Sequence, residues 1–67
     1  MKWIIRNAET EDVLEGFSKK DRSPRWTTDE RRAKWFMKWS EVSEAVDWAR
    51  KLGYDCYPVS ELFERDR

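Results

Sequence analysis

The chain has 67 residues and a single cysteine, and this combination most restricts the ways in which the protein can be stabilised. Cys56 cannot form a disulfide within the chain, so the disulfide network that stabilises many small secreted domains is excluded. A domain of this length buries only about 60% of the surface of its unfolded chain. Its stability must therefore depend on a few large side chains, and the five tryptophans can supply that burial. We expect one small domain over residues 1–67, with Cys56 as a buried hydrophobic residue.

The charge of the chain argues against several classes of function. Lys plus Arg and Asp plus Glu number fourteen each, so the formal net charge is zero and the whole molecule is not attracted to nucleic acids or membranes. No apolar run is long enough to span a bilayer, and the first residues lack the basic, apolar and small-residue pattern of a secretory signal. Together with the lone cysteine, these features lead us to expect a cytoplasmic protein. Because the chain has no histidine, the commonest catalytic base and metal ligand are missing. We therefore expect no enzymatic activity, no cofactor and no metal site.

Three segments have the composition of β-strands. Residues 2–6 contain an aromatic and two β-branched residues. Residues 13–17 are predicted as a second strand, with a helical turn ending at Gly16 as the alternative. Residues 54–59 are predicted as a third strand, which lies at a sheet edge because Pro58 cannot donate a hydrogen bond. The polar segments between residues 7 and 12 and between residues 18 and 25 are expected to be connections.

A short helix is predicted over residues 28–39. Thr27 and Glu30 have the spacing of a capping box, in which the Thr27 hydroxyl accepts from the Glu30 amide. On this helix three residues fall on one stripe that should face the core: Ala33, Phe36 and Met37.

The main helix is predicted over residues 41–52. Ser40 is its expected N-cap, and Gly53 is the expected left-handed residue that ends it. Five apolar residues fall on one stripe of this helix: Val42, Ala45, Val46, Ala49 and Leu52. The predicted fold class is therefore α+β, a small antiparallel sheet of two to three strands packed against the main helix with the shorter helix beside it. Residues 60–67 are expected to form a flexible or short helical tail.

The neutral total charge conceals a basic middle segment. Residues 17–39 contain eight Lys and Arg against three Asp and Glu, a net charge of +5. The segments before and after it carry net charges of −2 and −3. Three of the five tryptophans lie in the same basic segment. Aromatic rings and cations are thus interleaved there.

Trp35 is the tryptophan that the predicted short helix leaves outside the core. On a helical wheel it lies nearly opposite the apolar stripe, with Arg31 and Lys38 on one side and Trp39 on the other. Exposed Trp and Arg are enriched in binding hot spots, so we predict that these four residues contact a protein partner. The alternative is that the stems of Arg31 and Lys38 cover the indole. The other tryptophans are expected to serve the core: Trp3 and Trp48 in or beside it, and Trp26 as a lid over it.

Two further hypotheses use the same features. A small nucleic-acid-binding protein would place basic side chains on phosphates and stack an indole on a base. Besides Arg31 and Lys38, its candidate contacts are Lys19, Lys20, Arg22, Arg25, Arg32 and Lys34. In the other hypothesis the aromatic surplus forms the interface of a homodimeric structural or adaptor protein.

The order of residues resembles a kind of small protein found in bacteriophages and prophages, mostly of unassigned function. The resemblance covers roughly residues 3–57. It consists of an apolar N-terminal strand followed by Trp26-Thr27 with Asp29, Ala33 and Phe36, Glu44-Ala45, and Gly53. The Gly-rich turn of that pattern is replaced here by residues 19–25. The resemblance implies a compact sheet with one main helix and a protein that binds a host or defence complex, for example as an anti-CRISPR inhibitor.

Overall fold

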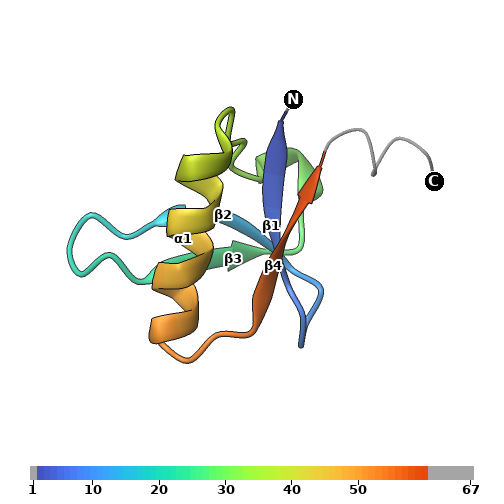
Figure 1. Cartoon of the computed structure of the whole chain (residues 1–67). Coiled ribbons are helices and arrows are strands. Elements are labelled where there is room, and N and C mark those ends of the chain that lie inside the picture. The colour runs from blue at the N-terminus through green and yellow to red at the C-terminus, as the bar shows by residue number, and fades with distance from the viewer. Residues whose placement is uncertain (1, 61–67) are drawn as a thin grey trace.

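The computed structural model describes residues 2–60 as an antiparallel sheet with an α-helix packed on one face (Figure 1). Its elements in chain order are β1 (Trp3–Asn7), β2 (Val13–Phe17), β3 (Pro24–Thr27), the 3-10 turn η1 (Glu30–Arg32), α1 (Trp39–Lys51) and β4 (Cys56–Ser60). The strand order is β3-β2-β1-β4, so β1 and β2 are central and the other two strands form the edges. The α+β class and the antiparallel sheet are confirmed, but the sheet has four strands rather than two to three.

The three predicted strands all exist. The segment 13–17 is a strand with the predicted bounds and not a helical turn. β4 lies at a sheet edge, as Pro58 indicated. β1 runs antiparallel beside it, and Ile5 lies opposite Pro58 in the register.

β3 is the strand that the sequence did not indicate. It has four residues, starts with Pro24 and overlaps the segment expected to be a connection. In its register with β2, Trp26 lies opposite Leu14 and Pro24 lies opposite Phe17. Trp26 is half-buried and packs against the main core. The pairing with β2 and the burial of this indole therefore define β3, because its own sequence has no alternating pattern.

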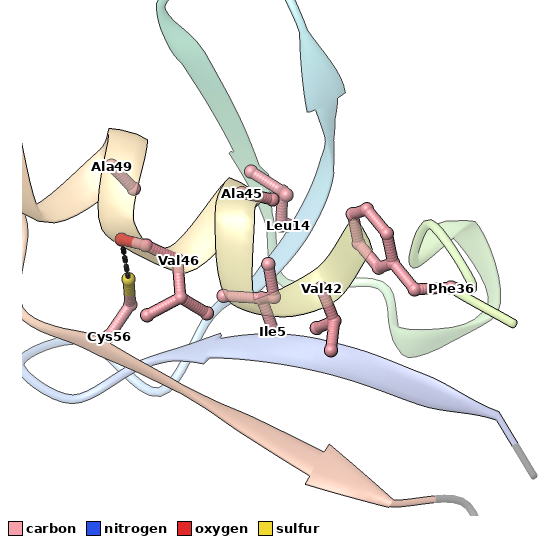
Figure 2. Packing of buried hydrophobic residues seen from close by; sticks show 8 residues of the cluster. All are labelled: Ile5, Leu14, Phe36, Val42, Ala45, Val46, Ala49 and Cys56. Atoms are coloured by element: carbon pink, nitrogen blue, oxygen red, sulfur yellow. Dashed lines mark hydrogen bonds between the residues drawn. The ribbon is translucent and has the colours of Figure 1, made fainter. Parts of the chain in front are cut away.

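α1 covers its face of the sheet through one apolar stripe. Four helix residues are buried: Val42, Ala45, Val46 and Ala49. Figure 2 shows them packed against residues from β1, β2 and β4, among them Ile5, Leu14 and Cys56. The Cys56 Sγ lies 4.0 Å from the carbonyl oxygen of Val46. Burial raises the pKa of the Cys56 thiol, and its side chain is the buried hydrophobic group that was predicted.

The segment around η1 forms a second, smaller core with the sheet. Ala33 is buried with Ile4 and Val13, and Val59 packs against this cluster. Two ion pairs reinforce the attachment: Arg6 to Glu30 at 3.2 Å and Arg32 to Glu15 at 2.7 Å. β1 therefore buries neighbouring isoleucines in two different clusters, which explains why its sequence is apolar on both faces.

The predicted helix over residues 28–39 does not form. The Thr27 hydroxyl accepts from the Asp29 amide rather than from that of Glu30. Asp29 then caps the three-residue turn η1 by accepting from the Arg31 amide at 3.0 Å. Further along, the Phe36 backbone exchanges two hydrogen bonds with Trp3 at 2.8 Å each. The backbone N–H and C=O groups of Phe36 thus form their hydrogen bonds with β1 instead of within a helix.

Three details of the helices also differ from the prediction. α1 begins at Trp39 and ends at Lys51, and its N-cap is Lys38, which makes no side-chain capping bond. Met37, expected in the core, is 60% exposed because residue 37 does not belong to a helix. Leu52 is 44% exposed because the helix has already ended there. Gly53 has a φ of 100°, which confirms the predicted left-handed stop. The predicted tail lies outside the described residues, apart from its first residue.

Candidate functional site

A hollow of about 390 Å³ lies between α1, the β2–β3 loop and residues 34–36. Four aromatic side chains line it: Phe17, Trp35, Phe36 and Trp48. Four charged side chains complete the lining with Ala45: Arg22, Lys34, Glu41 and Glu44. We call this hollow the tryptophan cleft. Its lining comes from three parts of the chain: residues 17–22, residues 34–36 and residues 41–48.

The β2–β3 loop is anchored to α1 by one indole. The Trp48 Nε1 donates a hydrogen bond of 2.8 Å to the Arg22 carbonyl oxygen. The Arg22 guanidinium carbon lies 4.8 Å from the centre of the same ring, which is a cation–π contact. The loop passes beside the helix in Figure 1, as these two contacts require. Trp48 therefore holds this wall of the cleft in place.

Residues 34–36 are fixed by backbone hydrogen bonds. The Lys34 amide donates to the Leu14 carbonyl at 2.8 Å, and Phe36 is bonded to Trp3. Cations again lie over the rings, because the Lys34 Nζ is 5.5 Å from the Phe36 ring centre and the Lys2 Nζ is 5.8 Å from that of Trp35. Trp35 is 42% exposed, so much of its indole remains available to a ligand.

The charges around the cleft are balanced. Arg22 and Lys34 contribute two cations, and Glu41 and Glu44 on α1 contribute two carboxylates. Neither carboxylate forms an ion pair with another residue among residues 2–60. Within the same range, no group of three acidic or thiol side chains could hold a metal ion. The cleft is open and its surface is both aromatic and polar, so it can contact a partner side chain with its rings and meet charges of either sign at its border.

A second hollow, of about 450 Å³, lies beside β4 and the start of α1. Its lining has no charged side chain and consists of Trp3, Trp39, Tyr57, Pro58, Val59 and Ser60. We call it the apolar groove. The rings of Trp3 and Trp39 meet edge to face, with centres 5.7 Å apart and planes inclined by 62°.

The structure gives the four residues predicted to contact a protein partner different surroundings. Trp35 lines the cleft and Trp39 lines the groove. The exposed Arg31 side chain pairs with Asp29 at 3.2 Å, and Lys38 is exposed before α1. The wheel that grouped these residues assumed a helix over residues 28–39, and that helix does not form.

The predicted nucleic-acid contacts also divide into groups. Arg22 and Lys34 line the cleft, whereas Arg32 is paired with Glu15. The remaining three are exposed in and beside the β2–β3 loop: Lys19, Lys20 and Arg25.

Sequence reasoning missed the contribution of α1 to the cleft. Glu41, Glu44 and Trp48 are spaced by three and four residues, which places them on one face of the predicted helix. That spacing was a usable signal. The contact between Arg22 and Trp48 had no signal in the sequence, because 26 residues separate the two.

Comparisons of the chain with protein-family models, with curated proteins and with solved structures find no match. The resemblance to small phage proteins therefore stays a prediction. None of the helices within residues 2–60 is long and apolar enough to cross a bilayer.

Proposed function

We propose that this protein is a non-enzymatic protein-interaction module that engages its partner through the tryptophan cleft. The proposal depends on the placement of Trp35, which is 42% exposed and lines a hollow together with Trp48, Arg22 and Lys34. Trp and Arg are the residues whose truncation most often costs binding energy at interfaces. A concave aromatic surface can remove a partner side chain from water, which is the main source of such energy.

The backbone of Arg22 supports the same site. Its φ is 61°, a left-handed conformation that costs a residue other than glycine roughly 1–2 kcal/mol. Such conformations cluster at binding and catalytic sites, where surrounding contacts hold them. Here the contacts are the hydrogen bond from Trp48 and the stacking of the guanidinium on its ring. The strained residue thus directs a cation to the border of the cleft.

The chemistry of the cleft favours a partner segment with an apolar or aromatic side chain at its centre. The two cations and two carboxylates around it favour neither an acidic nor a basic partner. The identification of that partner as a host or defence complex, and an inhibitory role such as an anti-CRISPR activity, come from the resemblance alone and are proposed on that ground.

The test compares protein capture by the wild type and by Trp35→Ala from a lysate of the natural source, measured by quantitative mass spectrometry. The control is Met37→Ala, because Met37 is 60% exposed and lies outside the cleft lining. We expect one protein to be retained by the wild type and by the control. Its affinity for Trp35→Ala should be at least about tenfold weaker, as for a hot-spot residue. Equal retention by all three proteins would overturn the proposal.

A second variant removes the cation without disturbing the loop. Glycine adopts the left-handed conformation of residue 22 without strain, and its carbonyl can still accept from Trp48. Arg22→Gly should therefore keep the fold and still lose part of the partner affinity. If its affinity equals that of the wild type, the guanidinium has no role in binding.

Nucleic-acid binding is the second candidate function, favoured by the cations gathered in and beside the β2–β3 loop. Lys19, Lys20 and Arg25 are exposed there. If the protein binds nucleic acid, oligonucleotides should quench its tryptophan fluorescence at low salt, and added salt should reverse the effect. The double variant Lys19→Ala, Lys20→Ala should then reduce the salt dependence. Quenching that is absent, or insensitive to salt, would exclude this function.

A further inference from the structure

We propose that the apolar groove binds a proline-rich peptide segment in the polyproline II conformation. The groove shares no lining residue with the tryptophan cleft, so this is a second site that does not depend on the first. The proposal is based on three properties: the lack of charge in the lining, the hydrogen-bond donors that the lining residues carry, and the nature of the neighbouring sheet edge.

The lining fits a neutral occupant with flat apolar rings. It contains three aromatic residues and no charged side chain. Trp39 is 55% exposed and Tyr57 is 41% exposed, so their rings are open to contact. A charged segment would lose its hydration here without gaining an opposite charge, which costs free energy. Pyrrolidine rings lose little hydration, and aromatic grooves bind them in several recognition domains.

The donors of the groove fit the backbone of such a segment. The indole N–H groups of Trp3 and Trp39 and the hydroxyl of Tyr57 make no hydrogen bond to another residue among residues 2–60. A polyproline II helix has no internal hydrogen bonds, so its carbonyl oxygens are free to accept. Proline has no N–H, so the occupant adds no competing donor. Three lining residues thus carry donors without a partner among residues 2–60, and a polyproline II segment has carbonyl oxygens that can accept from them.

The sheet edge beside the groove is poorly suited to a peptide that binds as an added β-strand. Pro58 has no N–H, which removes one donor from β4. The Cys56 carbonyl already accepts from the Arg50 Nε at 3.2 Å and from the Arg50 Nη2 at 2.9 Å. An added strand needs a regular row of donors and acceptors. A polyproline II peptide is held by ring stacking and single hydrogen bonds, so it does not need such a row.

The experiment titrates the full chain with a capped peptide of about ten prolines, long enough for several turns of the helix. A glycine-serine peptide of equal length is the negative control. The readout is the indole N–H cross-peaks of the five tryptophans in a ¹H–¹⁵N correlation spectrum. We expect the proline peptide to shift the peaks of Trp3 and Trp39, and those of Trp35 and Trp48 to stay in place.

Two substitutions at one position separate ring contact from hydrogen bonding. Trp39→Ala should weaken the affinity for the peptide at least about tenfold, and Trp39→Phe should weaken it less, because a ring remains after the donor is lost. Trp35→Ala is the matched control, since it alters the cleft alone and should bind the peptide like the wild type. Dispersed backbone spectra of all three variants show that each is folded. This control also makes failure of the groove proposal distinguishable from failure of the proposed function.

Four results would overturn the proposal. The Trp3 and Trp39 peaks could remain unmoved at saturating peptide, or the peaks of Trp35 and Trp48 could shift instead. A shift that depends on protein concentration without peptide would assign the groove to a second copy of the chain. A shift caused by Leu62→Ser with Phe63→Ser, again without peptide, would assign it to the chain's own C-terminal residues.

Discussion

The tryptophan cleft and the apolar groove both contain two indoles, but they differ in what surrounds the rings. In the cleft, Arg22 stacks on Trp48 and Lys2 lies over Trp35, and two carboxylates stand nearby. In the groove, Trp3 and Trp39 contact each other and no charged side chain is present. Tryptophan therefore lines both a hollow with charged side chains and a hollow without them, and these charges determine which groups each hollow can bind.

The two hollows also differ in how much they contribute to the fold. Trp48 is half-buried and joins α1 to the β2–β3 loop by a hydrogen bond. Trp39 is 55% exposed, and its indole makes no hydrogen bond to another described residue. One indole of the cleft is thus part of the framework, whereas the exposed indole of the groove is available for binding at little cost to stability.

The largest expected effect is the difference between two alanine substitutions. Trp48→Ala removes a half-buried ring and releases the loop, and should lower the free energy of unfolding by about 3 kcal/mol. Trp39→Ala removes a mostly exposed ring and should lower it by about 1 kcal/mol or less. Urea denaturation followed by circular dichroism measures both. Equal losses would show that the two indoles have the same structural role.

A smaller effect separates the hydrogen bond of Trp48 from its ring. The Trp26 Nε1 is buried without a hydrogen-bond partner among residues 2–60, whereas the Trp48 Nε1 donates to Arg22. Phenylalanine removes the N–H in both cases and shortens the side chain by a similar amount. Trp48→Phe should therefore destabilise the protein by about 1 kcal/mol more than Trp26→Phe. The reverse order in chemical denaturation would mean that the bond across the cleft contributes nothing.

The smallest effect is a difference in the response to acid. Ser23 donates to Asp21 from its backbone amide and its hydroxyl, and these bonds lower the pKa of the Asp21 carboxyl. Because the folded-state pKa is lowered, this stabilisation is present above the ordinary pKa of aspartate and is lost as the pH falls through the lowered value. The loop that contains Asp21 and Arg22 should therefore loosen in acid.

The two hollows provide the readout for this response. On titration from about pH 7 to about pH 3, the indole N–H peak of Trp48 should move, because its hydrogen-bond acceptor lies in that loop. The peak of Trp39 should stay, since the groove lining has no carboxylate. Asp21→Asn should reduce the movement of the Trp48 peak. Equal movement of both peaks would contradict the separation of the two sites.

The sequence predicted the elements whose patterns are local. Residues 13–17 form a strand with the predicted bounds, and the apolar stripe from Val42 to Ala49 defines the buried face of α1. Gly53 ends the helix because a left-handed residue is needed there. In each case the information lies within a few residues of the element itself.

The prediction failed where distant partners decide the structure. The capping-box pattern at Thr27 was outweighed by the ion pair of Glu30 with Arg6 and by the backbone bonds of Phe36 to Trp3. β3 depends on its pairing with β2 and not on its own pattern. Such contacts join residues far apart in sequence, and local propensity does not encode them.

The candidate site was predicted in part for the same reason. Trp35 was expected to be exposed beside cations, and the structure places Lys2 over its ring and Lys34 in the same cleft lining. Its exposure follows from an extended segment rather than from the far side of a helix. The residue type and the basic segment were informative, whereas the geometry required the fold.

The most direct test of the central claim is photo-crosslinking from the two hollows. A photoreactive benzophenone amino acid replaces Trp35 in one sample and Trp39 in another, and crosslinked proteins from the natural source are identified by mass spectrometry. The account predicts that position 35 crosslinks the protein that the wild type retains and that position 39 does not. Crosslinking of that protein from position 39 alone, or from neither position, would contradict the claim that the tryptophan cleft is the binding site.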